Sequence, residues 1–232
     1  MKALFSLCLI AVFVFTFTGC SERLSSSSKV GDTVKLGGME WVVLAVKDDA
    51  ALILSKSVLT KIVEFDVQVI AHGEVKPTQK NSTFAPDMRA FQLSDSTATW
   101  ETSDIRKYLN DAFYNATFSD SEKKRIIQTT LVNDAHPTLN GGANTMDRVF
   151  LLSVTEWIEY VGNDKSQAVR DAMASVRDWW LRTPWPALGG YMTPATTCGV
   201  AYMLKCGSGI GEYGAPVNSE QGIRPAMWVK LK

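Results

Sequence analysis

Residues 1–19 determine which part of this chain can fold. One positive residue, Lys2, precedes an apolar run from Ala3 to Phe17. The run has about the length of the hydrophobic region of a secretory signal peptide and is shorter than the roughly 18 residues that a membrane-spanning helix needs. We therefore expect residues 1–19 to be a signal peptide that is removed. The mature protein then has 232 minus 19, or 213, residues.

The apolar run ends in Phe17-Thr18-Gly19-Cys20. This segment resembles the lipobox of bacterial lipoproteins, in which small residues precede a cysteine that is acylated and becomes the new N-terminus. The resemblance implies that Cys20 carries palmitate or another acyl chain, which anchors the protein to a membrane outside the cytosol. Ser21 after the cysteine favours the outer membrane or cell surface over the inner membrane. The alternative is an ordinary signal peptide cut near Gly19, which leaves a free thiol.

Residues 20–29 form a short, polar, serine-rich stretch. This composition is typical of a flexible tether because it cannot bury apolar area. We therefore expect one folded domain over residues 30–232. The chain has 24 basic and 24 acidic residues, so the mature protein without Lys2 has a net charge of 23 minus 24, or −1. That balance argues against a nucleic-acid partner and gives no reason to expect electrostatic attraction to an anionic membrane.

Apolar runs and period-two alternation predict strands in both halves of the domain. Residues 73–99 show no sustained period and are expected to form a long surface loop, with His72 on the polar face of the strand before it. The predicted strands are Val30–Leu36, a hairpin of Trp41–Val46 with Ala50–Leu54, Val63–Ala71, Phe150–Leu152, Trp179–Arg182, Gly199–Lys205, Ile210–Tyr213 and Ala226–Leu231.

N-cap residues mark three predicted helices. Ser103 precedes an amphipathic helix over 104–113. The pairs Ser119/Glu122 and Ser153/Glu156 are capping boxes, in which the serine accepts from an orphan amide and the glutamate reaches back. The helix that begins after Ser119 is expected to run to about Ile127. Residues 167–178 are expected to be helical as well. The whole pattern predicts a single α+β domain.

Six segments of the chain together form a recognisable pattern. They are Val30-Gly31-Asp32, Gly37 and Trp41–Leu44; Trp100, Ser103, Ile105, Arg106, Leu109, Asn110 and Phe113; Phe118-Ser119 and Glu122; Phe150–Ser153 and Glu156; Trp179–Pro184; and Gly222–Trp228. In this order they resemble a bacterial family of secreted and surface proteins known only as domain of unknown function 6273. The resemblance implies no activity, because none is assigned to the family.

The segments Trp179–Arg182 and Gly222–Pro225 also resemble the C-type-lectin-like fold of sulfatase-modifying oxidases and bacterial surface modules. This resemblance implies a mixed, mostly antiparallel sheet, two or three helices and long loops. In such a fold the loops after the tryptophan strand display ligand contacts. The aromatic residues there are candidates for binding a ligand, with packing as the alternative; they are Trp185, Tyr191, Tyr202 and Tyr213.

A second aromatic group is interpreted as structural. Large rings inside strands usually belong to a core, and an arginine beside them often fixes carbonyls or carboxylates, although rings and guanidinium groups can also bind ligands. This group comprises Trp179, Trp180, Arg182, Arg224 and Trp228.

The chain shows no zinc-ligand spacing, and we expect no metal and no cofactor. Asp134, Asn140, Asn144 and Asp147 are candidates for binding calcium through their side-chain oxygen atoms. The stronger alternative is that these residues form turns. Cys198 and Cys206 favour a disulfide in an oxidising compartment. A continuous strand between them would hold them about 25 Å apart, however, and a disulfide needs Cα atoms within about 7 Å.

These features favour a lipid-anchored, noncatalytic module that binds a glycan, a peptide or an envelope protein. No nucleophile-elbow serine, phosphate loop or histidine motif is present, which lowers the odds of catalysis without excluding it. One alternative is an enzyme related to the sulfatase-modifying oxidases that uses Cys198 or Cys206. Another is a purely structural envelope lipoprotein.

Overall fold

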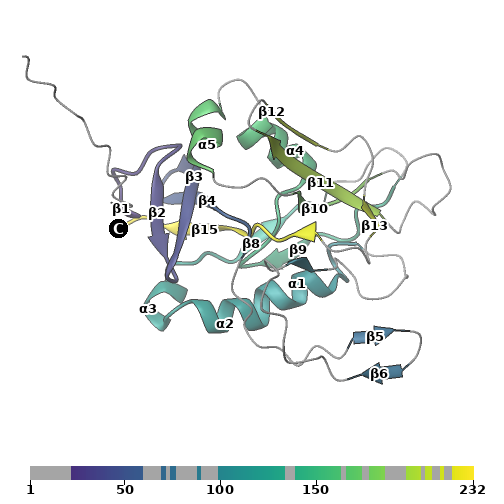
Figure 1. Ribbon diagram of the computed structural model, residues 1–232. Helices are drawn as coiled ribbons and strands as arrows, with labels where there is room; N and C mark the ends of the chain where they lie inside the picture. The colour runs from purple at the N-terminus through teal and green to yellow at the C-terminus, as the bar shows by residue number, and fades with distance from the viewer. Residues whose placement is uncertain are drawn as a thin grey trace, which may run out of the picture.

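The computed structural model describes most of the expected domain and none of the expected signal peptide. Its described residues form an α+β domain with mixed, mostly antiparallel sheets and four helical segments, as the sequence predicts (Figure 1). They are 22–59, 69–71, 74–76, 88–89, 99–133, 139–162, 166–173, 178–185, 197–204, 207–210, 215–216 and 221–232.

The first sheet joins the two ends of the domain. Its strand order is β1-β2-β3-β4-β15, and every pairing is antiparallel except the parallel pair of β1 with β2. Strand β4 is buried at every residue, because it lies inside the sheet and is covered on both faces. The strands are β1 (Glu22–Arg23), β2 (Thr33–Leu36), β3 (Met39–Lys47), β4 (Ala50–Ser55) and β15 (Ala226–Lys230).

The second sheet is centred on the tryptophan strand β10, which is buried throughout. Its order is β12-β11-β10-β14-β7, and β13 pairs with β11. Two short hairpins, β5 with β6 and β8 with β9, stand apart from both sheets. The strands are β5 (Val69–Ala71), β6 (Glu74–Lys76), β7 (Met88–Arg89), β8 (Thr129–Leu131), β9 (Thr145–Asp147), β10 (Trp179–Pro184), β11 (Thr197–Leu204), β12 (Gly207–Ile210), β13 (Ala215–Pro216) and β14 (Gln221–Gly222).

The helices begin where the capping residues predict. Ser103 accepts from the Arg106 amide at 3.2 Å, and both capping boxes are formed, with Ser119 and Ser153 as N-caps. Two of the helical segments contain a π-helical turn. The helices are α1 (Asp104–Tyr108), the π-turn η1 (Leu109–Phe113) and α2 (Tyr114–Thr117) in one run; α3 (Asp120–Lys123); α4 (Val154–Trp157) with η2 (Ile158–Gly162); and α5 (Gln167–Ala172).

One hydrophobic core connects the sheets and the helices. Its largest members are fully buried rings contributed by distant segments, namely Trp41 of β3, Trp100 before α1, and Trp179 and Trp180 of β10. Trp41 Nε1 also donates to the Leu36 carbonyl at 2.9 Å, so this ring satisfies its polar group inside the core.

The serine-rich segment is not a free tether over the residues that the structure describes. Strand β1 pairs with β2, Leu24 is 1% exposed, and the Ser26 amide donates to the Lys232 carbonyl at 3.2 Å. One leucine and a line of backbone hydrogen bonds attach the segment, although its serines contribute little apolar area. The residues from Glu22 to Lys29 therefore already belong to the domain, ahead of Val30.

Several expected elements are shorter or placed differently. The predicted surface loop contains strands β6 and β7, because their backbones pair with β5 and β14. Helix α5 ends at Ala172, and α3 ends at Lys123. Phe150 forms a single bridge to Ala226 in place of a strand, and β12 begins at Gly207, three residues before the predicted strand Ile210–Tyr213.

The β2–β3 turn offers a matched pair of glycine substitutions. Gly37 and Gly38 both have left-handed backbones, with φ of 58° and 69°. A Cβ on Gly37 would lie 2.7 Å from Thr117 Cγ2, whereas a Cβ on Gly38 would meet nothing within 4 Å. We expect Gly38→Ala to cost about 1 kcal/mol of unfolding free energy through backbone strain alone. Gly37→Ala should cost clearly more, because the helix must also move.

Urea unfolding of both variants measures this difference. Equal losses for the two substitutions would contradict the close contact of the turn with the helix.

Candidate functional site

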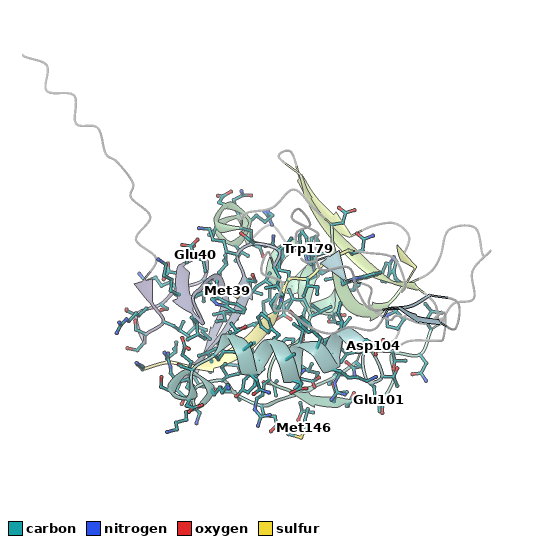
Figure 2. The ribbon with its side chains drawn as sticks, turned by 60° about the horizontal axis from the view of Figure 1, so that its bottom comes forward. Met39, Glu40, Glu101, Asp104, Met146 and Trp179 are labelled. Carbon is teal, nitrogen blue, oxygen red and sulfur yellow. The ribbon has the colours of Figure 1, made fainter. Side chains whose placement is uncertain are left out.

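A cavity of about 930 Å³ lies where the β2–β3 turn, the chain after β4 and the helical segments meet. This volume falls within the range of small-molecule sites, about 300–1,000 Å³. Figure 2 shows Met39 and Glu40 together beside the α1–α2 run, away from Met146 and Glu101. The cavity is lined by Gly37, Gly38, Met39, Glu40, Ser55, Ser57, Val58, Leu59, Phe113, Ala116, Thr117, Ser119 and Glu122.

Glu122 joins the helical wall of the cavity to the turn. Its Oε1 accepts from the Gly37 amide at 2.8 Å, and its Oε2 accepts from the Ser119 amide at 2.9 Å and the Ser119 hydroxyl at 2.7 Å. Burial by itself would raise the pKa of Glu122, but the hydrogen bonds from Gly37 and Ser119 and the nearby Arg125 outweigh burial and lower it. The carboxylate is therefore ionised at neutral pH and holds the turn in place.

The opposite wall is positioned by a buried arginine. Arg224 is 1% exposed, and its Nη1 donates to the carbonyl oxygens of Ser55 at 3.2 Å and Lys56 at 2.9 Å. Its guanidinium lies 4.6 Å from the centre of the Trp179 ring. Burial lowers the pKa of Arg224 to about 9, so the group stays charged at neutral pH. Arg224 thus fixes the chain that follows β4.

The rim of the cavity carries an ion pair. Lys56 Nζ lies 3.1 Å from Glu40 Oε2, with the two side chains 28% and 42% exposed. Since both groups are partly in water, this pair contributes little to stability. It leaves Glu40 accessible to a ligand that approaches the cavity.

The lining of the cavity combines carboxylates, hydroxyls and apolar side chains. Among the described residues that line the cavity, Glu40 and Glu122 are the charged ones. The other polar side chains of this lining are the hydroxyls of Ser55, Ser57, Thr117 and Ser119. Apolar surface comes from Met39, Val58, Leu59 and Phe113. Carboxylates and hydroxyls accept hydrogen bonds from ammonium and hydroxyl groups, so the lining suits a ligand that presents such donors beside an apolar part.

The aromatic and arginine residues that were interpreted as structural lie largely in the core. Trp179, Trp180 and Arg182 are at most 3% exposed, and Trp228 in β15 is half-buried. Arg182 donates to both carboxylate oxygens of Glu156 and to the carbonyls of Leu151 at 2.8 Å and Val132 at 3.2 Å. This arginine ties the α4 capping box to the second sheet.

The aromatic residues expected to bind a ligand are not brought to the cavity by any described contact. Trp185 follows β10 and packs half-buried against the core. The backbone of Tyr202 pairs with Gly209 in the β11–β12 hairpin. Tyr191 and Tyr213 lie outside the residues that the structure describes, as does Cys20.

The cysteine pair stays a prediction. Cys198 lies in β11, opposite Pro184 and Ala215, and β11 continues to Leu204. The six strand steps from Cys198 to Leu204, at roughly 3.3 Å each, span about 20 Å. Cys206 lies outside the described part of the chain.

The oxygen atoms of the conceivable calcium set bind protein groups instead. Asn144 Oδ1 accepts from the Asn133 amide at 3.2 Å, and Asn140 Oδ1 accepts from the Gly142 amide at 3.0 Å. Asp134 is outside the described residues. Within the described ranges, no group of three or more His, Cys, Asp or Glu residues gathers to hold a metal ion.

Asp147, the last member of that set, is the centre of a buried polar cluster. Its Oδ1 accepts from Arg106 Nε at 2.8 Å, and its Oδ2 accepts from Trp100 Nε1 at 2.8 Å and Thr145 Oγ1 at 2.7 Å. The Asp147 side chain is 1% exposed. The carboxylate therefore attaches α1 and the segment before it to the β8–β9 hairpin.

The cavity residues Met39, Glu40, Ser57, Ala116 and Thr117 were not predicted from the sequence. Each belongs to a segment with an ordinary local pattern, and the cavity exists because three such segments meet. The Gly37-Gly38 pair was the one available signal, since it marks a tight turn whose backbone can approach a helix closely.

Residues 48–231 match the family described as Domain of unknown function (DUF6273), and the chain belongs to this family. Five of the six resembling segments lie inside the matched range, whereas Val30–Leu44 precedes it. No curated protein and no solved structure matches the chain. A search of the described residues finds no helix with the length and apolar character needed to cross a membrane.

The Asp147 cluster predicts a large loss of stability on a small change. In Asp147→Asn, an amide that carries two donors replaces a carboxylate that accepts three hydrogen bonds, and the positive charge of Arg106 loses its partner. We expect a loss of about 3 kcal/mol in unfolding free energy.

The matched control is Asp111→Asn on the exposed face of η1, where the carboxylate accepts from the Asn115 side-chain amide at 3.0 Å. It should cost less than about 0.5 kcal/mol. Chemical denaturation of both variants tests the difference, and similar stabilities would argue against the cluster as a structural centre.

Proposed function

We propose that this protein is a lipid-anchored, extracytoplasmic, noncatalytic binding module and that its ligand enters the cavity between the β2–β3 turn and the helical segments. The observation that carries the binding role is the cavity itself, whose volume is that of a small-molecule or peptide side-chain site. The lipobox-like segment before Cys20 supports the anchor and a place at the outer membrane or cell surface.

The lining suggests the chemistry of the ligand. Glu40 and Glu122 give the cavity a negative character that the rim residue Lys56 offsets only in part. An amino sugar or a peptide with an ammonium group would match these carboxylates, and its apolar part would contact Met39 and Phe113. A glycan or peptide of the envelope is therefore the expected ligand class, and the cavity replaces the C-terminal aromatic residues as its binding site.

Filling the cavity tests the binding role. Ala116 lines the cavity and is exposed, so Ala116→Trp should occupy the space without disturbing the core. Glycan and peptide arrays probed with the native protein identify a ligand. Its affinity for Ala116→Trp should fall by about tenfold or more, which corresponds to about 1.4 kcal/mol or more.

The control is Asn115→Trp, which adds the same ring one residue away, on an exposed position that does not line the cavity. This variant should bind as the native protein does. Equal binding by both variants would place the ligand elsewhere, and failure of the native protein to bind on either array would count against the binding role.

The anchor is tested by metabolic labelling with radioactive palmitate. The native chain and Cys8→Ser should incorporate the label, because Cys8 lies in the expected signal peptide and is absent from the mature protein. Cys20→Ser should not incorporate it. Label in Cys20→Ser, or none in the native chain, would contradict lipidation at Cys20.

A further inference from the structure

The start of the described chain is fixed to the domain at its first residues. Glu22 and Arg23 pair in register with Val34 and Lys35 of β2, and Leu24 is buried beneath them. Arg125 Nη2 donates to the Leu24 carbonyl at 3.1 Å. Strand β1 is therefore attached directly to the domain, with no flexible segment between β1 and the core.

This attachment limits how far the domain can stand from an acyl group on Cys20. Ser21 is the single residue between Cys20 and β1. Since consecutive Cα atoms are 3.80 Å apart, Cys20 and Glu22 have Cα atoms within about 7.6 Å of each other. A lipid-anchored Cys20 thus holds the β1 end of the domain at the level of the lipid headgroups.

We propose that the end of the molecule formed by residues 22–36, 123–125 and 230–232 is a membrane face, and that its basic side chains bind the anionic headgroups of the bilayer. This inference rests on the proposed anchor at Cys20. Figure 1 shows β1, β2, α3 and the last residues of the chain gathered at one end of the molecule, with β11 and β13 at the other.

The charge of this end differs from that of the whole chain. Its three segments contain two acidic residues, Glu22 and Asp32, and eight basic ones, a balance of 8 minus 2, or +6; the basic residues are Arg23, Lys29, Lys35, Lys123, Lys124, Arg125, Lys230 and Lys232. The full chain has a net charge of zero. A basic end on a neutral chain was not visible in the composition, because the three segments are far apart in sequence.

Acidic neighbours reduce this excess without cancelling it. Asp48, Asp49 and Asp120 lie beside the membrane face, since the Leu231 amide donates to the Asp49 carbonyl and Asp120 begins α3. Glu122 directs its carboxylate to Gly37 and Ser119, toward the cavity. Glu40 is the cross-strand neighbour of Lys35 and forms an ion pair with Lys56. If these four acidic residues and the Glu40–Lys56 pair are all counted, the balance stays positive at 9 minus 7, or +2.

Backbone and side-chain hydrogen bonds hold the basic segments together. The Lys230 amide donates to the Arg125 carbonyl at 2.9 Å, and Arg125 Nε donates to the Lys230 carbonyl at 3.0 Å. The side chains of Arg23, Lys35, Lys230 and Lys232 belong to exposed residues. Each basic residue near an anionic membrane surface contributes about a fivefold gain in binding, and the effect fades within a Debye length.

Lysine footprinting on vesicles tests the membrane face. The lipidated full-length protein is purified, reconstituted into vesicles of phosphatidylcholine alone or with phosphatidylglycerol, and treated briefly with an amine-reactive ester. Mass spectrometry then compares Lys35, Lys230 and Lys232 with Lys107 of α1, whose side chain is 67% exposed. We expect the three lysines to react about fivefold more slowly relative to Lys107 on the anionic vesicles.

Two sets of variants separate the anchor from the charge. A flexible Gly/Ser insertion of about 20 residues between Ser21 and Glu22 moves the domain about 25 Å from the bilayer, beyond the Debye length, and should abolish the protection. Lys35→Gln with Lys230→Gln should abolish the protection of Lys232. The control is Asn140→Asp with Met146→Glu, two exposed positions outside the membrane face. This control changes the net charge by the same −2, keeps Lys107 as the reference and should preserve the protection.

The outcomes distinguish this inference from the proposed function. If the purified protein fails to float with either vesicle, the anchor is wrong and the membrane face falls with it. If the protein floats but the reactivity ratios are the same on neutral and anionic vesicles, or the same with the insertion, the anchor stands and the membrane face is overturned.

Discussion

Strand β15 holds the fold together because both of its edges are paired with distant parts of the chain. One edge pairs with β4 from Ala226 to Lys230. The other edge makes bridges to Phe150 and Ile126, and the Trp228 carbonyl accepts from the Ile127 amide at 2.9 Å. A strand without a free edge cannot slip in register without breaking both sets of bonds. The early hairpin, the chain after α3 and the loop before α4 all take their positions from it.

Buried charged side chains hold further segments in their relative positions. Arg182 with Glu156 and Asp147 with Arg106 connect segments that β15 does not pair. Arg224, two residues before β15, binds the Ser55 and Lys56 carbonyls at the end of β4. A buried ion pair with its hydrogen bonds made is weak support for stability but strong support for one arrangement, since any other leaves a charge without partners. These charged side chains belong to the segments by which the family is recognised, except Asp147. The recognisable part of the sequence therefore includes much of this framework, and it also includes Gly37, Phe113, Ser119 and Glu122 of the cavity wall.

The sequence predicted the features that depend on neighbouring residues. The capping boxes at Ser119 and Ser153 and the β3–β4 hairpin follow local rules, and the structure has them. Composition did not reveal that residues 22–29 are attached to the domain, because a count of serines cannot show that β2 pairs with β1 and that Leu24 is buried in the core. The cavity could not be predicted for a similar reason, since it arises from the approach of Gly37 to the helical run. Both the attachment of residues 22–29 and the cavity depend on contacts between residues that are far apart in the sequence.

Helix α3 connects the two proposals physically. Its Glu122 faces the cavity and fixes the turn at Gly37, whereas Lys123, Lys124 and Arg125 follow directly and belong to the membrane face. A domain held at the headgroups by β1 and this basic segment would have its cavity near the bilayer surface, because the same short helix borders both. The ligand would then be reached most readily if it also lay at that surface, as a headgroup-proximal glycan or peptide does. The short link formed by Cys20 and Ser21 would orient the domain on the membrane. The position of the cavity, together with its carboxylates, would then restrict which ligands can bind.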